Sequence, residues 1–106
     1  MQAVLKALAE PRRVAILKLL AGGEMRAGEI ADRFDTTRPA ISEHLRVLTE
    51  ARLVVQRREG TRRIYAVRSE GFAELRHFID QFWDDRLARL KSAAEKEARG
   101  TVRRKR

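Results

Sequence analysis

Two pairs of arginines flank a single glycine, since Arg57-Arg58 and Arg62-Arg63 stand on either side of Gly60. A guanidinium group stays charged at physiological pH and donates paired hydrogen bonds to phosphate oxygens. Charged side chains also protect an exposed strand edge from aggregation, which is the structural alternative. Because Glu59 is the only acid between the pairs, this cluster favours contact with phosphates or with a DNA minor groove.

A second group of polar and small side chains lies in residues 37–48. Its apolar residues recur at helical spacing, at Ile41, Leu45 and Leu48. A rotation of 100° per residue then turns the opposite face of this helix outward. Val47 lies on that face as well. On that face Glu43 can accept a hydrogen bond from cytosine, and Arg38 can bind a guanine edge or a phosphate. The residues predicted to contact DNA here are Thr37, Arg38, Pro39, Ala40, Glu43, His44 and Arg46.

The sequence lacks the groupings that catalysis needs. It contains no cysteine, which excludes disulfides, thiolate metal sites and a cysteine nucleophile. His44 and His77 fall on different predicted helices, and neither has a serine nucleophile placed beside it. Asp84 and Asp85 are adjacent, so in a helix they point about 100° apart and form no catalytic pair. We therefore expect neither enzymatic activity nor a cofactor.

The predicted elements place both groups close together in sequence. We expect helices near residues 4–8, 11–20, 27–34 and 37–51, strands at 53–58 and 62–67, and a long helix over 70–99. Pro11 suits a first helical turn, and Thr37 is the expected cap of the fourth helix. The fold class is therefore mainly helical with a small β-hairpin. This order is typical of a winged helix-turn-helix, whose second helix enters the major groove.

The last predicted helix carries a wide apolar stripe, and Phe78 is one of its large side chains. Left exposed, such a stripe would be a patch of the kind that monomers avoid. Pairing with a second copy, together with the first helix, would bury it, so we expect a homodimer. The predicted interface residues are Val4, Leu5, Phe72, Leu75, Ile79, Phe82, Trp83, Leu87 and Leu90.

Length and charge limit the remaining possibilities. The chain has 106 residues and a net charge of +9, which suits one domain over residues 1–99 and a basic, disordered tail over 100–106. Residues 37–68 hold eight arginines and three glutamates, so the folded part is itself basic. No apolar run is long enough to cross a membrane, and the first residues do not resemble a secretion signal. We expect a cytoplasmic protein that contacts no membrane.

The chain resembles the ArsR/SmtB family of bacterial transcriptional repressors over nearly its whole length except the tail. The segments that carry the resemblance are residues 7–17, 24–31, 37–48 and 60–67, above all the run Ser42-Glu43-His44-Leu45-Arg46-Val47-Leu48. The resemblance implies a homodimer that binds an operator, blocks transcription and is released by an effector. It also implies that Ser42 and His44 lie on the DNA-facing helix.

One departure from the family concerns metal binding. Members that sense metals carry a Cys-x-Cys box, and the corresponding positions here are Arg26 and Gly28, which do not bind a soft metal. Other members use Asp and His on the last helix. His77 and Asp80 offer half of such a site, with no second pair before them. The resemblance therefore points to the metal-independent branch, with no metal site and an unidentified small-molecule or protein effector.

The leading hypothesis is thus a sequence-specific DNA-binding regulator, a dimeric repressor of a pseudo-palindromic operator on double-stranded DNA. Two alternatives stay open. A winged helix can instead dock an acidic protein partner, and a basic domain can bind DNA without sequence preference as an architectural protein.

Overall fold

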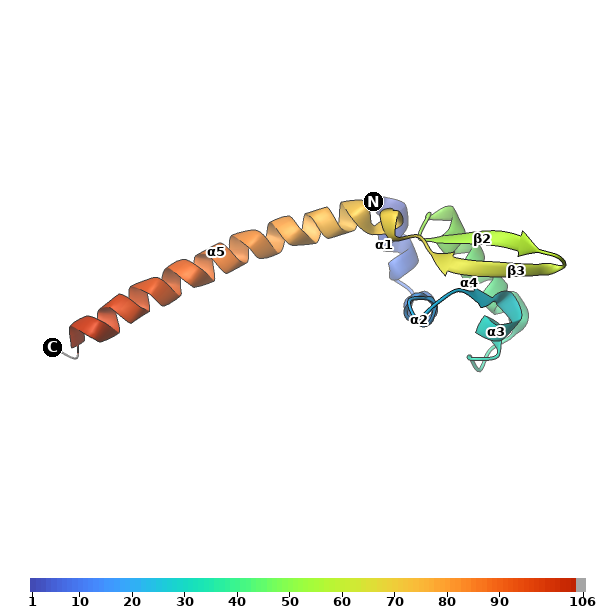
Figure 1. Ribbon diagram of the computed structural model, residues 1–106, viewed down its shortest axis with the longest axis horizontal. Helices are drawn as coiled ribbons and strands as arrows, with labels where there is room; N and C mark the ends of the chain where they lie inside the picture. Colours follow the sequence, from blue (N-terminus) through green and yellow to red (C-terminus); the bar gives the residue numbers. More distant parts are fainter. Residues whose placement is uncertain (105–106) are drawn as a thin grey trace. The chain divides into compact units, whose positions relative to one another are not determined.

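Along the chain, short helices are followed by a β-hairpin and then by one long helix (Figure 1). This computed structural model describes the backbone of residues 1–104 and the side chains of residues 1–98. Its elements are α1 (Gln2–Leu8), α2 (Pro11–Leu20), β1 (Met25–Arg26), α3 (Ala27–Ala31), α4 (Arg38–Glu50), β2 (Val54–Glu59), β3 (Arg62–Val67), the 3₁₀ turn η1 (Ser69–Phe72) and α5 (Ala73–Arg104). The predicted order of helices and hairpin strands is confirmed, and one short strand is added.

Internal contacts group the chain into two units, Met1–Glu74 and Leu75–Arg106. The first unit holds α1 to α4 and the sheet, and the second is formed by α5. The expected basic tail, residues 100–106, overlaps the end of α5 and otherwise lies outside the described residues. No helix within the described part of the chain is long and apolar enough to span a membrane.

The starts of helices α2 and α4 follow from their capping residues. The Glu10 carboxylate accepts a hydrogen bond from the backbone N–H of Arg12 at 3.2 Å, and Pro11 opens α2. The Thr37 hydroxyl oxygen accepts from the backbone N–H of Ala40 at 3.2 Å and caps α4. A capping side chain satisfies an N–H that has no partner inside the helix. The predicted start of α4 at this threonine is therefore confirmed.

The helix before α4 is shorter than the sequence predicts. Helix α3 ends at Ala31, and residues up to Phe34 continue as a turn instead of a helix. The guanidinium of Arg12 lies 5.3 Å from the centre of the Phe34 ring, which is a cation–π distance. This contact fixes the turn between α3 and α4 against α2.

The core of the first unit collects the apolar faces of all four helices. The three residues predicted to form the buried stripe of α4, Ile41, Leu45 and Leu48, are at most 1% exposed. The other buried residues are Val4, Ala7, Ile16, Leu17, Leu20, Ile30, Ala31, Ala51, Leu53, Val54 and Tyr65. Because α4 packs with this stripe inward, its opposite face is the one that reaches solvent.

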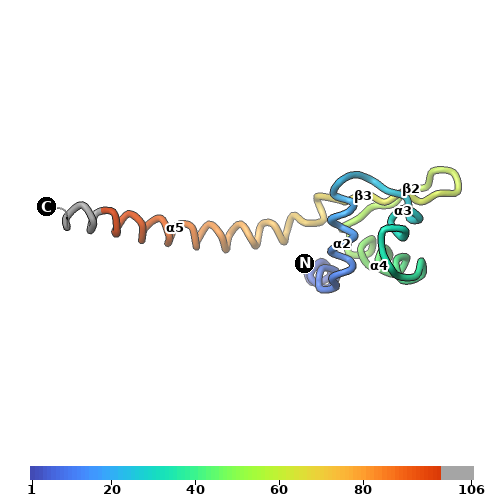
Figure 2. The backbone as a smooth tube through the Cα atoms, turned by 90° about the horizontal axis from the view of Figure 1, so that it is seen from below, coloured from blue at the N-terminus to red at the C-terminus, as the bar shows by residue number. Residues whose placement is uncertain are grey.

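The sheet has the strand order β1-β3-β2, with both pairs antiparallel. Gly60, with φ at +64°, and Thr61 connect β2 to β3. In both views of the backbone this hairpin turn extends beyond the helices of its unit (Figure 1, Figure 2). Strand β1 is only two residues long, too short to show the alternation by which a strand is predicted.

Helix α4 ends in a Schellman motif built on an arginine. The N–H of Leu53 donates to the carbonyl of Leu48 at 3.1 Å, and that of Arg52 donates to Thr49 at 3.0 Å. Arg52 has a φ of +63°, a left-handed conformation that the Cβ of an L-residue disfavours.

We predict that Arg52→Gly stabilises the fold. Glycine adopts this conformation without the Cβ penalty, so the free energy of unfolding should rise by about 0.5–1 kcal/mol. Thermal denaturation measures the effect as a higher Tm. Arg58→Gly is the control, because it places glycine in strand β2, where added backbone freedom should lower the Tm. An unchanged or lower Tm for Arg52→Gly would contradict the prediction.

Candidate nucleic-acid interface

The outward face of α4 presents five of the predicted residues to solvent, namely Arg38, Pro39, Ser42, Glu43 and Arg46. Ala40, His44 and Val47 are instead half-buried. The exposed Thr37 uses its hydroxyl to cap the helix. The face available to a ligand is therefore polar, with small side chains recessed between longer ones.

Two glutamates compensate the charge of Arg46. Its guanidinium donates to Glu43 at 2.5 and 2.9 Å and to Glu50 at 2.6 Å. The hydrogen bonds from Arg46 hold the pKa of the Glu43 carboxyl below its usual value. The hydrogen bonds that Arg46 donates to Glu43, and then the one to Glu50, raise the pKa of Arg46. One guanidinium is thus paired with two carboxylates, so this part of α4 adds no positive charge to the surface.

His44 contacts a second helix of its own chain. Its Nδ1 lies 3.4 Å from Nη1 of Arg13, which is on α2. The same arginine donates to the carbonyls of Ala7 at 2.7 Å and of Lys6 at 3.2 Å, at the end of α1. Arg13 thus joins α1, α2 and α4. Sequence analysis missed this role, because the pair is separated by 31 residues.

The hairpin divides its arginines between two faces. Arg57 pairs with Ile64 and Glu59 with Arg62 in the register of β2 and β3, whereas Arg58 pairs with Arg63. Residues that pair across strands share a face, and neighbours alternate. Arg63 also lines the groove between the hairpin and α4, whose other lining residues are Ala27, Pro39, Ser42, Glu43, Arg46, Thr49, Glu50, Gln56 and Tyr65. One face of the hairpin and the outward face of α4 thus border the same groove.

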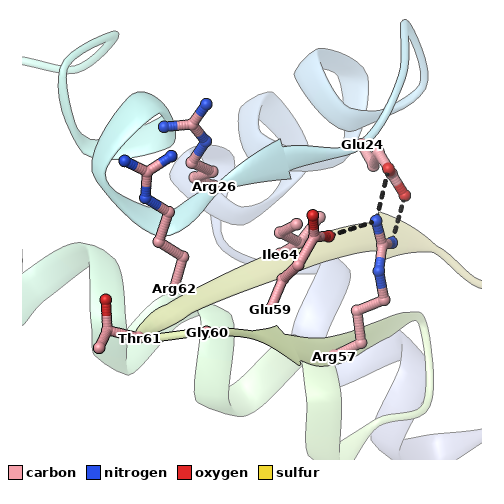
Figure 3. Close-up of a pocket in the computed structure, with 8 residues that line it drawn as sticks. All are labelled: Glu24, Arg26, Arg57, Glu59, Gly60, Thr61, Arg62 and Ile64. Atoms are coloured by element: carbon pink, nitrogen blue, oxygen red, sulfur yellow. Dashed lines mark hydrogen bonds and ion pairs between the residues drawn. The ribbon is translucent and has the colours of Figure 1, made fainter.

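Arg57 is held by carboxylates in the free protein. It donates to Glu24 at 2.5 and 2.8 Å and to Glu59 at 3.2 Å (Figure 3). The hydrogen bonds from Arg57 lower the pKa of the Glu24 carboxyl. The bonds that Arg57 donates to Glu24, and then the one to Glu59, raise the pKa of Arg57. Of the four hairpin arginines, this one therefore contributes least to the local positive charge.

The other predicted arginines are unpaired. Among the described side chains, no carboxylate lies within 4.0 Å of the guanidinium groups of Arg38, Arg58, Arg62 and Arg63. Three of them, Arg38, Arg62 and Arg63, line one hollow at the start of α4 and the hairpin turn. Free guanidinium groups at such a tip suit the phosphates of a nucleic acid backbone.

We predict that Glu24→Gln increases affinity for duplex DNA of any sequence. The change releases the guanidinium of Arg57 from its shortest ion pair. The salt dependence of binding should become steeper by about 0.9 for each added phosphate contact. Fluorescence anisotropy over a range of salt concentrations measures both effects. Glu70→Gln is the control, since it removes another exposed carboxylate from an ion pair, the one with Arg68. Equal effects of the two variants would contradict the prediction.

Comparison with known proteins agrees with this geometry. The family described as "Bacterial regulatory protein, arsR family" matches residues 10–55, which include α2, α3 and α4. The HTH-type transcriptional regulator Rv2034 of Mycobacterium tuberculosis is 47% identical over 78 residues, covering 74% of this chain and 73% of the relative. The chain belongs to the arsR family of bacterial regulatory proteins. Its function class is that of a DNA-binding transcriptional regulator.

Two further comparisons extend this result. The transcriptional repressor SdpR of Bacillus subtilis is 45% identical over 60 residues, covering 57% of this chain and 67% of the repressor. A solution structure of a homodimeric winged helix-turn-helix DNA-binding domain from Mycobacterium bovis has 38% sequence identity and a TM-score of 0.64, covering 79% of this chain and 78% of that one. The winged helix-turn-helix fold predicted from the sequence is thereby confirmed.

This member of the arsR family has no cysteine in its sequence. Among the described residues, no group of three or more His, Cys, Asp or Glu side chains is placed to hold a metal ion. The two candidates from the sequence, His77 and Asp80, are exposed on α5, and Asp80 lies 3.7 Å from Arg76. The described side chains therefore offer an arginine-rich surface and no assembled metal site.

Proposed function

We propose that the protein is a dimeric repressor that binds a pseudo-palindromic DNA operator. The observation that carries this proposal is the cluster of unpaired arginines at the start of α4 and on the hairpin. These charges border the outward face of α4. In the proposed complex α4 lies in the major groove, and Arg58, Arg62 and Arg63 hold the sugar-phosphate backbone or the minor groove.

Base recognition is assigned to the outward face of α4. Pro39, Ala40 and Ser42 present small groups that fit beside thymine methyls or donate a hydrogen bond to a base edge. Glu43 either accepts a hydrogen bond from cytosine or stays paired with Arg46. In the second case the Glu43 carboxylate orients the guanidinium of Arg46. Half-buried His44 supports the helix through Arg13 and borders the same face.

The second half of the proposal is dimerisation through α5. Its apolar stripe is 40–59% exposed in the single chain, at Phe78, Ile79, Phe82, Trp83, Leu87 and Leu90. A second copy is the occupant that we propose, because a two-fold pair of such helices buries both stripes against each other. From α1, Leu5 is 49% exposed and available to join, whereas Val4 is buried in its own unit. Phe72 and Leu75 are half-buried.

A symmetric pair of subunits sets the form of the DNA site. Two α4 helices related by a two-fold axis fit half-sites about one helical turn, or about 34 Å, apart. Two chains of +9 each also give a strongly basic dimer, whose affinity should fall steeply with salt. In this proposal the protein lies in the cytoplasm. It regulates genes by binding DNA and catalyses no reaction. Its effector has no assigned site among the described residues.

The experiment that tests the proposal compares two classes of variant on two duplexes. One duplex carries an inverted repeat from the promoter region of the protein's own coding sequence, and the other carries the same bases scrambled. Arg62→Ala and Arg63→Ala should weaken binding to both alike, because phosphates carry no sequence information. Ser42→Ala and Glu43→Ala should change the ratio between the two duplexes. Equal losses for all four variants would contradict the division of roles.

A further inference from the structure

A hollow beside the hairpin turn gathers arginines from three elements. Arg26 from β1, Arg38 from α4 and Arg62 and Arg63 from β3 line it, with Glu29 the only acid. Figure 3 shows the guanidinium groups of Arg26 and Arg62 beside each other, apart from the ion pair between Glu24 and Arg57. Arg26 is not among the residues predicted to contact DNA.

The backbone explains why these side chains converge. Arg26 is paired with Ile64 in the sheet, so Arg62, two residues before Ile64, is its diagonal neighbour on the same face. The third arginine lies over Gly28, since a Cβ at that position would meet Nη2 of Arg38 at an ordinary contact distance of 3.7 Å. Arg38 thus extends over the first turn of α3.

The charges in the hollow are not balanced by the protein. Four guanidinium groups face one carboxylate, and that carboxylate lies 3.5 Å from Nε of Arg26. Like charges at such a site repel one another, and a bound anion offsets this repulsion. Guanidinium groups that converge from different elements give the paired donors that a phosphate binds best.

We propose that this hollow binds one phosphate of the DNA backbone, held by Arg26, Arg38 and Arg62. The inference rests on the proposed function and adds a contact to it, because the phosphate ties β1 and the start of α4 to the hairpin. In this role Arg26 is a DNA-positioning residue: it fixes how deeply α4 enters the major groove without reading a base.

The test uses the full-length protein and a labelled duplex of random sequence at near-physiological salt. Fluorescence anisotropy should show that Arg26→Gln weakens binding about tenfold, the effect expected for losing a charge-assisted hydrogen bond. Arg26→Gln combined with Arg62→Gln should weaken binding by less than the product of the single effects, because both side chains share one phosphate. Multiplicative effects, or no loss for Arg26→Gln, would overturn the proposal.

Two controls separate direct contact from general charge. Lys18→Gln removes one positive charge from an exposed position of α2 that does not line the hollow, and it should change affinity less than twofold. Arg26→Gln combined with Glu29→Gln keeps the net charge of the wild type. This charge-matched double variant should stay weakened, since the phosphate has still lost its ligand. Full recovery of affinity would show that Arg26 acts only through the overall field.

A final measurement distinguishes the source of the phosphate. Inorganic phosphate titrated into the DNA-free protein should give only weak calorimetric signals, equal in wild type and Arg26→Gln. Strong phosphate binding that Arg26→Gln abolishes, with DNA affinity unchanged, would assign the hollow to a free anion and overturn the DNA contact. Failure of the wild type to bind any duplex would instead reject the proposed function itself.

Discussion

Phe82→Asp should convert the protein from a dimer into a monomer. In the proposed dimer this ring, 59% exposed in the single chain and in edge contact with Trp83, lies within the seam between two α5 helices. An aspartate there would place an unpaired charge in apolar surroundings, which costs far more than the lost ring contacts. Truncation to alanine alone should cost about 3–5 kcal/mol if the ring is fully buried.

The same substitution should weaken operator binding by about 100-fold or more, because two linked recognition helices act with a high effective concentration. Sedimentation velocity at micromolar concentration and anisotropy on the inverted repeat measure the two effects. The matched control is Gln81→Asp, which adds the same charge on an exposed neighbour turned 100° around the helix, away from the stripe. A variant of Phe82 that sediments as a dimer would contradict the assignment of α5.

Gly71→Ala should destabilise the first unit more than any other conservative change proposed. A Cβ at this position would lie 2.0 Å from the carbonyl oxygen and 2.9 Å from the carbonyl carbon of Arg52. Both are backbone atoms, so no side-chain rotation relieves the clash. The neighbouring backbone is fixed by hydrogen bonds from the N–H of Arg68 to Leu53 at 2.8 Å and from that of Gly71 to Arg68 at 2.9 Å.

We expect the free energy of unfolding to fall by about 3 kcal/mol, near the upper end for overpacking, and the Tm to fall by more than about 10 °C. Thermal denaturation followed by circular dichroism at one fixed protein concentration measures the change. Gly22→Ala is the control, because a Cβ there would meet its nearest atom at an ordinary 3.5 Å. A Tm for Gly71→Ala close to that of Gly22→Ala would show that the two segments separate easily.

The elements that sequence predicts correctly are those in which local pattern and burial agree. The stripe of α4 repeats at helical spacing and is buried, and Thr37 and Pro11 mark helix starts by capping chemistry and fixed φ. The start of α5 was predicted less well. Sequence places helix from residue 70, whereas residues 69–72 form a 3₁₀ turn, in which Gly71 lies so close to Arg52 that a Cβ would clash with it.

The candidate site was predicted only in part, for a physical reason. Residue types along one element indicate which side chains are charged, but not which charges are already neutralised. Arg57 and Glu24 are 33 residues apart in the chain, and strand β1, which sets their approach, is two residues long. The same strand brings Arg26 to the hairpin. Ion pairing across the sheet therefore separates neutralised from free arginines, and only the three-dimensional structure reveals it.

The most direct test of a symmetric pair of α4 helices on one duplex is hydroxyl-radical and methylation footprinting on the inverted repeat. Such a pair should give two equivalent protected regions with major-groove protection centred about 10 bp apart, and both regions should be lost in Phe82→Asp. A single protected region, or protection that extends evenly along any sequence, would contradict this arrangement.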